Sequence, residues 1–254
     1  MASPLPSALR ALLHRRFTRI VVFSGAGMSA ESGIPTFRSG RNGLWNAFDP
    51  QALATPQAWR RDRDTVWGWY EWRRGLVMAA SPHAGHGAVA RLRNELDAEV
   101  VTQNVDNLHE RAGADGVMHL HGSLFSPRCD TCGAPFSLTA SPPPEPSRQR
   151  PPPPCPACPG AIRPGVVWFG ESLDPAVVEA ATAAIIRCDL LLIVGTSGMV
   201  YPAAGLVDLA PPDALIVEIN PEPARSTGRI GYAWATTAAT GLPALAEHLL
   251  AYSR

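Results

Sequence analysis

The sequence contains no lysine, because all 22 of its basic residues are arginine. The protein therefore cannot be modified on a lysine of its own. It also lacks net charge, since 22 acidic residues balance the arginines, and this excludes a strong field that would attract nucleic acid or an anionic membrane. No apolar run approaches the roughly 18 residues that a membrane span needs. We therefore expect neither a nucleic-acid partner nor a membrane.

Cysteine is sparse as well, but four of the five cysteines form two pairs. The pairs Cys129-x-x-Cys132 and Cys155-x-x-Cys158 are separated by 22 residues. Two such knuckles match a tetrahedral zinc site, and four thiolates leave no open position, so the metal would be structural. A disulfide pair and chance are the alternatives. The fifth, Cys188, is expected to be a buried thiol rather than a nucleophile.

The N-terminal region is basic and has no acidic residue before Glu31, a composition superficially similar to a transit peptide. Residues Leu9–Arg16 instead read as a short helix that leads into a strand at Ile20. We therefore expect a cytoplasmic protein, in which free thiols stay reduced and paired cysteines hold metal.

Short apolar runs alternate with helical patterns along the chain. The runs predict strands covered on both faces and lie at Ile20–Phe23, Glu99–Thr102, Leu190–Val194 and Ala214–Ile219. The helical patterns between and after them lie at His83–Leu96, Pro175–Ile186 and Leu242–Tyr252. This alternation predicts an α/β fold with a doubly wound parallel sheet.

Small or polar residues follow each predicted strand. They are Ser24-Gly25-Ala26-Gly27, Gln103-Asn104, Gly195-Thr196-Ser197 and Asn220. Ligands of open α/β sheets bind beyond the carboxyl ends of the strands, and a glycine-rich turn lets backbone N–H groups approach a phosphate. The acidic residue that a dehydrogenase carries about 20 positions after its glycines is missing, because Phe48-Asp49-Pro50 reads as a loop. A dinucleotide would be held in another manner.

Two clusters of polar residues carry the chemistry. Gln103, Asn104 and Asp106 suit a carboxamide and ribose hydroxyls, although each taken alone is as typical of loop capping. His121 is a candidate general base because histidine titrates near neutrality. A hydrogen-bonded core histidine is the alternative, and His119 lies too near for the spacing to separate the two.

Two further segments interrupt the alternation. Residues 163–171 suit either an exposed edge strand that pairs with a peptide or a buried hinge strand. Residues 142–154 are rich in proline and predict an exposed, polyproline-like loop.

Five ordered segments resemble the sirtuins, a family of NAD-dependent protein-lysine deacylases. The resemblance covers the chain from Ile20 to about Leu245. The segments are Gly25-Ala26-Gly27-x-Ser29-x-x-Ser32-Gly33-Ile34-Pro35-x-Phe37-Arg38, Thr102-Gln103-Asn104-x-Asp106-x-Leu108-His109, His121-Gly122-Ser123, Val167-Trp168-Phe169-Gly170-Glu171 and Gly195-Thr196-Ser197.

The resemblance implies a Rossmann-like sheet with a smaller inserted zinc-binding domain, and NAD and substrate between them. The Rossmann-like domain would comprise residues 1–43, 81–126 and 163–254, and the small domain a helical insertion at 44–80 and a zinc module at 127–162. The NAD site would comprise Gly25, Ala26, Gly27, Phe37, Arg38, Gln103, Asn104, Asp106, Gly195, Thr196, Ser197, Asn220 and Ala238.

The resemblance also implies a reaction. His121, rather than His119, corresponds to the family base, and Asn104 joins it as a catalytic residue. The products would be free lysine, nicotinamide and O-acyl-ADP-ribose. The acylated peptide would lie along Val167, Trp168, Phe169, Gly170 and Glu171, and we expect the protein to act as a monomer.

A pocket for the acyl group is implied by Tyr70 and Arg73, which are three residues apart on a predicted helix and thus share one face. With Ala54 upstream, they resemble the sirtuin subgroup that removes succinyl and malonyl groups, since a guanidinium and a phenol suit a terminal carboxylate. A packing tyrosine beside a solvated arginine is the alternative. The rival functions are mono-ADP-ribosyl transfer and a catalytically silent NAD or ADP-ribose sensor.

Overall fold

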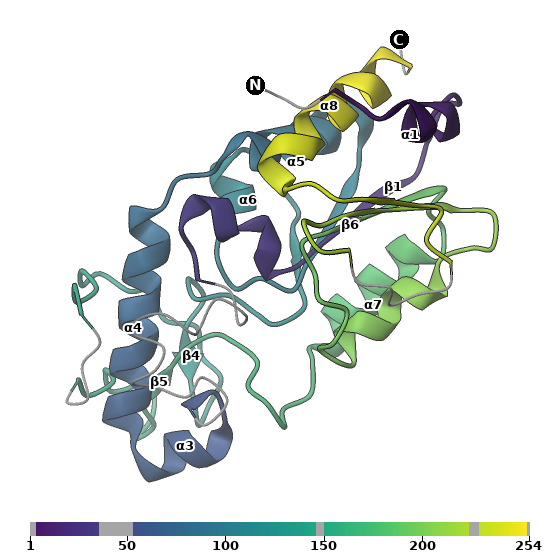
Figure 1. Ribbon diagram of the computed structural model, residues 1–254. Coiled ribbons are helices and arrows are strands. Elements are labelled where there is room, and N and C mark those ends of the chain that lie inside the picture. Colours follow the sequence, from purple (N-terminus) through teal and green to yellow (C-terminus); the bar gives the residue numbers. More distant parts are fainter. Residues whose placement is uncertain (1–3, 36–52, 146–149, 224–228, 253–254) are drawn as a thin grey trace.

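The computed structural model describes residues 4–35, 53–145, 150–223 and 229–252. Phe37 and Arg38 lie outside the described residues. Figure 1 shows a sheet with helices on both of its faces and, toward the lower left, a group of helices and a small hairpin. No helix in these ranges combines the length and the apolar character needed to cross a membrane.

The described part of the chain forms a six-stranded parallel sheet in the order β3-β2-β1-β6-β7-β8. Its strands are β1 (Ile20–Ser24), β2 (Glu99–Thr102), β3 (Met118–His119), β6 (Leu190–Val194), β7 (Leu215–Ile219) and β8 (Tyr232–Trp234). The four predicted strands are therefore confirmed, and they form the centre of the sheet. Strands β3 and β8 escaped prediction because two or three residues carry no readable periodicity.

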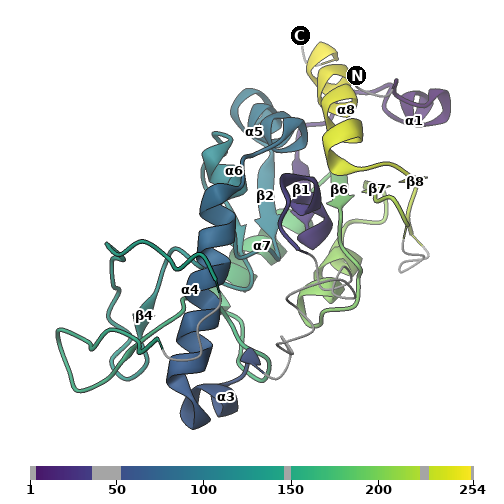
Figure 2. The ribbon, with the colours of Figure 1, turned by 60° about the vertical axis from the view of Figure 1, so that its left-hand side comes forward.

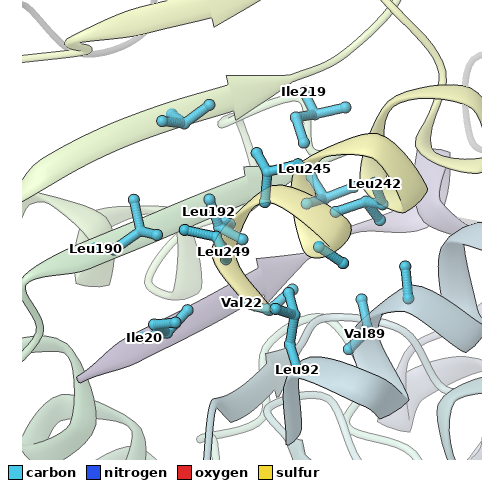
Figure 3. Packing of buried hydrophobic residues seen from close by; sticks show 14 of the residues in the cluster. Ile20, Val22, Val89, Leu92, Leu190, Leu192, Ile219, Leu242, Leu245 and Leu249 are labelled. Carbon is cyan, nitrogen blue, oxygen red and sulfur yellow. The ribbon is translucent and has the colours of Figure 1, made fainter. Parts of the chain in front are cut away.

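Both faces of the sheet are covered, as Figure 2 shows. Helices α1 (Ser7–Leu12), α5 (Ala84–Leu96) and α8 (Ala238–Ala251) cover one face, where they share a core with alternate residues of β1 and β6. Figure 3 shows Leu242, Leu245 and Leu249 of α8 directed toward Leu192 and Val22 of the strands. Helix α7 (Pro175–Ile185) and the 3₁₀ helix at Ala203–Leu209 cover the other face. This double covering explains why the strands are continuously apolar.

Two predicted helix boundaries are wrong. Helix α8 begins at Ala238 rather than Leu242, because the Thr237 side chain caps it by accepting a hydrogen bond from the N–H of Thr240. Pro243, which is typical of a first turn, lies inside the helix. Helix α1 runs over Ser7–Leu12 and ends before the predicted Arg16.

The second group of elements comprises α3 (Pro56–Arg61), α4 (Arg63–Ala79) and the antiparallel pair β4 (Arg128–Cys129) and β5 (Ile162–Arg163). We call these elements, with the residues packed on them, the small lobe. Its core is aromatic and includes Trp59, Trp67, Trp69, Tyr70, Trp72 and Trp168 together with Cys129 and Cys155. Within the predicted helical insertion at 44–80, the described residues form α3 and α4, and their aromatic rings contribute to a separate hydrophobic core.

A buried ion pair fastens the proline-rich segment to α4. The Arg74 guanidinium donates two hydrogen bonds of 2.9 Å to the Glu71 carboxylate and one of 2.8 Å to the carbonyl of Ala140. A second guanidinium, that of Arg150, lies 3.8 Å from Glu71. Ala140, just before the predicted exposed loop, and Arg150 within it are therefore both held near α4.

We expect Arg74→Met to lower the free energy of unfolding by about 3–5 kcal/mol, because Glu71 would keep a buried charge without its main partner. Urea unfolding measures this loss. The matched control is Arg91→Met on α5, whose guanidinium pairs with Glu95 and Glu247 in an exposed position, and which should lower the free energy of unfolding far less because exposed ion pairs contribute little. Equal losses in the two variants would contradict the assignment.

Candidate functional site

The carboxyl ends of the central strands meet at one edge of the sheet, and backbone hydrogen bonds join the segments that leave them. Gln103 donates to the Ser24 carbonyl over 2.9 Å, and Gly25 donates to the Val194 carbonyl over 2.9 Å. Gly195 donates to the Ile219 carbonyl over 3.0 Å. The predicted convergence of the four strand ends is confirmed.

The glycines of the first segment are required by a neighbouring loop. A Cβ on Gly27 would lie 2.7 Å from the Cα of Gly195, and one on Gly25 would lie 2.9 Å from the Cα of Thr196. Gly195 itself has φ +60°, which favours glycine. The sequence interpretation gave these glycines a role only in the approach of a phosphate, and this was incomplete. They also allow the loop after β1 to pack closely against the loop after β6.

Amide and hydroxyl side chains line this edge. The Gln103 amide donates to the Thr196 hydroxyl over 3.0 Å, and the Asn220 amide donates to the Thr196 carbonyl over 3.0 Å. Ser197 follows at a half-buried position, and its hydroxyl accepts a 3.4 Å hydrogen bond from the N–H of Met199. Three strands therefore contribute to one polar cluster centred on Thr196.

A second polar cluster lies beside the first. The Asn104 amide donates to the Ser29 hydroxyl over 3.2 Å, and that hydroxyl donates to the Asp106 carboxylate over 2.8 Å. Burial raises the pKa of Asp106, although the hydrogen bonds from the Leu108 N–H and from Ser29 oppose this. Ser29 was missed as a site residue, and its position two residues after Gly27 was the signal that pointed to it.

Two alanines of the predicted NAD site lie near this edge. Ala26 begins a 3₁₀ turn directly after β1 and is half-buried. Ala238 is buried at the start of α8, where its carbonyl lies against Gly85 of α5.

His121 lies just beyond β3 with a defined ring orientation. Its Nδ1 is 2.9 Å from the carbonyl oxygen of Gln103. Because a carbonyl only accepts, Nδ1 carries the proton and the neutral ring keeps a lone pair on Nε2. Burial lowers the pKa of His121 and outweighs the hydrogen bond to Gln103. The ring is thus neutral near pH 7, as a general base requires.

His119 lies two residues before His121 and makes contacts of a different kind. Its Nδ1 is 2.9 Å from the Asn104 carbonyl oxygen, and its Nε2 is 2.6 Å from a carboxylate oxygen of Glu110. Both ring nitrogens therefore face acceptors. Of these two histidines, only His121 keeps a nitrogen with a free lone pair, and its role as the base stays a prediction.

The segment after the cysteines connects the small lobe to the sheet. Val167 donates to the His121 carbonyl over 2.8 Å, and Phe169 donates to the Ala54 carbonyl over 2.9 Å. Gly122 bridges to Val166 with φ +71°, and a Cβ on it would lie 2.2 Å from the carbonyl oxygen of Gly165. The neighbouring backbone of Gly165 therefore fills the space beside Gly122.

The turn that follows is stabilised by an ion pair. Arg163 binds the Glu171 carboxylate through two hydrogen bonds of 2.6 and 2.8 Å, and it lies 3.6 Å from the centre of the Trp168 ring. Phe169 and Gly170 are exposed at its tip. The segment therefore begins as a strand at Arg163, is buried at Val166 and ends in an exposed turn, so the exposed part is no edge strand. Pairing with a peptide stays a prediction.

Tyr70 of α4 contacts this segment, and Arg73 lies beside Tyr70 on the same helix. The Tyr70 hydroxyl accepts a 3.1 Å hydrogen bond from the Trp168 indole, and burial raises its pKa to about 12. The Arg73 guanidinium lies 4.8 Å from the Trp69 ring centre and 5.5 Å from that of Tyr70. Burial lowers the pKa of Arg73, while the Tyr70 phenol and the Asp106 carboxylate oppose this. The Asp106 carboxylate at the edge of the sheet therefore interacts electrostatically with Arg73 of the small lobe.

The four paired cysteines form one compact cluster. The sulfurs of Cys129 and Cys158 are 3.4 Å apart, those of Cys132 and Cys155 are 3.8 Å apart, and all four lie within 4.8 Å of one another. A zinc ion with four bonds of 2.3 Å would set its sulfurs about 3.8 Å apart. Backbone N–H groups point at three of these sulfurs, which favours thiolates. The cluster therefore fits a structural zinc ion.

These features define a class of protein: a Rossmann-like nucleotide-binding α/β fold with a second lobe built around a cysteine cluster. The Sir2 family model matches residues 25–202. The chain belongs to the Sir2 family, the sirtuins, as the sequence predicted.

Individual proteins agree with this assignment. The chain is 55% identical over 212 residues to "NAD-dependent protein deacylase 1" of Pseudomonas aeruginosa, with 82% of this chain and 85% of that protein covered. It is 48% identical over 232 residues to "NAD-dependent protein deacylase" of Mycobacterium tuberculosis, with 91% and 98% covered. A crystal structure of a Sir2 homolog–NAD complex superimposes with a TM-score of 0.87 at 40% identity and covers 98% of this chain and 95% of that one.

Proposed function

We propose that this chain is an NAD-dependent deacylase that removes succinyl and malonyl groups, and also acetyl groups, from lysine side chains of proteins. Its products are free lysine, nicotinamide and O-acyl-ADP-ribose. Membership of the Sir2 family and the names of the similar proteins support the deacylase activity. The observation that supports the preference for an acidic acyl group is that Trp168 binds the Tyr70 hydroxyl while the Arg73 guanidinium lies beside the Tyr70 ring.

The polar edge of the sheet suits NAD. Gln103, Thr196 and Asn220 offer amide and hydroxyl groups for ribose and phosphate oxygens, and no acidic residue ends β2, where a dehydrogenase carries one. When bound, NAD supplies the ribose carbon that takes the acyl oxygen and the nicotinamide that leaves. Asn104 and Asp106, fixed through Ser29, would orient the carboxamide of the ligand.

His121 supplies the base. Its Nε2 takes a proton from a ribose hydroxyl, and the imidazolium that forms is stabilised by the bond from Nδ1 to the Gln103 carbonyl. The backbone carbonyl of His121 accepts a hydrogen bond from the N–H of Val167. The base is therefore joined directly to the segment that would hold the peptide. The acylated lysine would therefore enter beside the base.

The acyl pocket follows from the same geometry. Val167 and Phe169 are fixed to His121 and Ala54, and the indole of Trp168 reaches from this segment to the Tyr70 hydroxyl. A lysine held along the segment would direct its acyl end toward Arg73, one helical turn from Tyr70. A guanidinium binds a carboxylate through two parallel hydrogen bonds, and a half-buried position strengthens them.

We expect Arg73→Met to lower kcat/KM for a succinyl-lysine peptide about 30-fold more than for the matched acetyl-lysine peptide, because one buried charge pair would be lost. Nicotinamide release and the mass of the peptide measure both reactions. Tyr70→Phe should act in the same direction with a smaller effect, since it removes only a hydroxyl.

The control is Arg60→Met on the exposed end of α3, which should change neither reaction. An equal loss on the two peptides in Arg73→Met would refute the acidic pocket but leave the deacylase in place. A gain of ADP-ribose on the peptide would favour mono-ADP-ribosyl transfer, and NAD binding with no turnover would favour a sensor.

A further inference from the structure

His119 is held between two acceptors at the edge of the site. Its Nδ1 lies 2.9 Å from the Asn104 carbonyl and its Nε2 lies 2.6 Å from the Glu110 carboxylate. The hydrogen bond to His119 favours the ionised form of Glu110 and lowers its pKa. With an ionised Glu110, neither acceptor can donate, so this geometry favours protons on both ring nitrogens. The His119 side chain is 15% exposed and that of Glu110 is 39% exposed.

The hydrogen bond from His119 holds the backbone peptide group of Asn104, a residue of the proposed NAD site. The Asn104 N–H donates to the Thr102 hydroxyl over 3.1 Å, and the Asn104 amide donates to Ser29 over 3.2 Å. His119 binds the remaining backbone group of Asn104. This third contact further fixes the orientation of Asn104.

The groups around His119 favour its charge. Asp106, in the loop after β2, and Glu110 of α6 (Leu108–Arg111) are carboxylates. The neighbouring His109 of α6 has a pKa lowered to about 4, mainly by burial, and stays neutral. Helix α7, which packs near β3, carries one titratable group, Glu179, which is exposed. Burial of His119 opposes its charge, but the hydrogen bonds to Glu110 and Asn104 prevail and raise its pKa.

We propose that His119 and Glu110 form a positioning pair, in which a charged imidazole clamps the Asn104 peptide and places a fixed positive charge beside Asp106. His119 is thus no duplicate of His121. The two histidines divide the work by charge: His121 must be neutral to accept a proton, and His119 must be charged to hold the site. Only the kinetic readout of this proposal, kcat/KM, rests on the proposed function.

The two requirements set a pH window. His121 loses its basic form as the pH falls through its lowered pKa, and His119 loses its charge as the pH rises through its raised pKa. NAD binding and kcat/KM should therefore decline above the pKa of His119. The loss of one charge-assisted hydrogen bond is expected to weaken NAD binding roughly tenfold.

The test uses the isosteric variant Glu110→Gln in the full-length protein. A titration followed by ¹⁵N NMR of the imidazole should show both nitrogens of wild-type His119 protonated at pH 7, and the pKa of His119 should fall by roughly 1–3 units in the variant. Calorimetry of NAD binding as a function of pH should show the alkaline decline displaced by the same amount. Glu110→Asp, which keeps the charge, should restore most of the wild-type profile.

Glu179→Gln on α7 is the matched control and should leave both profiles unchanged. A His119 that is neutral at pH 7 in the wild-type protein would overturn the proposal. So would a Glu110→Gln variant with a lower melting temperature but an unshifted pH profile, since this would show a purely structural role. Because NMR and NAD binding require no turnover, a failure of deacylation on every peptide would be seen separately.

Discussion

Replacement of His121 with alanine is expected to lower kcat for deacylation by about 10²–10⁴-fold, the usual contribution of a positioned base. The structure gives the reason. The Gln103 carbonyl lies 2.9 Å from Nδ1 of His121, so the lone pair of the ring is on Nε2. The methyl side chain of alanine cannot accept a proton. The affinity for NAD should change little, because the polar cluster at Gln103, Thr196 and Asn220 is untouched.

The pH dependence of the wild-type enzyme gives a second readout for His121. Burial lowers its pKa below the ordinary value of 6.5, so the neutral form dominates near pH 7 and is lost only as the pH falls through the lowered value. The acid limb of the profile of log kcat/KM against pH should therefore lie below 6.5. His121→Ala should remove this limb together with the activity.

His14→Ala is the matched control, since His14 is an exposed histidine whose Nδ1 lies against the Ala11 carbonyl. It should keep full activity and the wild-type acid limb. A His121→Ala enzyme that retained more than about a tenth of the wild-type kcat would contradict the assignment of the base.

The sheet could be predicted because its local and tertiary signals agree. The four central strands are apolar on both sides, and each ends in a small or polar residue, so that both their existence and their convergence were readable. The edge strands β3 and β8 were not, since residues such as Met118 and Tyr232 lie in segments too short to show a period. Their pairing depends on the central strands already being in place.

The chemistry of the site could be predicted only in part, because it depends on contacts between distant segments. His119 and His121 look alike in the sequence, and only the Glu110 and Gln103 partners separate their charges. Ser29 became part of the site through contacts with residues about 75 positions away. Sequence spacing contains no information on such partners unless a family resemblance supplies it.

The largest effect on stability is expected from the cysteine cluster. Structural zinc contributes about 10–16 kcal/mol to the folding of small zinc domains, and the strands that carry the cysteine segments give little support of their own, since β4 and β5 pair over only two residues each. The variant Cys132→Ser should therefore lose its zinc and unfold the lobe. Metal analysis should find one zinc per wild-type chain and none in the variant.

Tryptophan fluorescence should report this change directly. Five of the seven tryptophans lie in the core of the small lobe, and Trp59 and Trp168 belong to the same cluster as Cys129 and Cys155. Loss of the metal should expose these rings and shift the emission to the red. The matched control is Cys188→Ala, whose thiol is buried against the sheet with a pKa raised to about 11 by burial, and which should keep one zinc and the wild-type spectrum.

The zinc-free variant also separates the two halves of the proposed site. Thr196, Gln103 and Asn220 are held by the sheet, whereas Tyr70, Arg73 and Trp168 are held by the small lobe. Removal of the metal should therefore abolish desuccinylation while much of the affinity for ADP-ribose, which needs only the sheet, is retained. If zinc-free protein kept its emission spectrum and its activity on succinyl-lysine, the aromatic core alone would stabilise the lobe, and the metal would have no structural role.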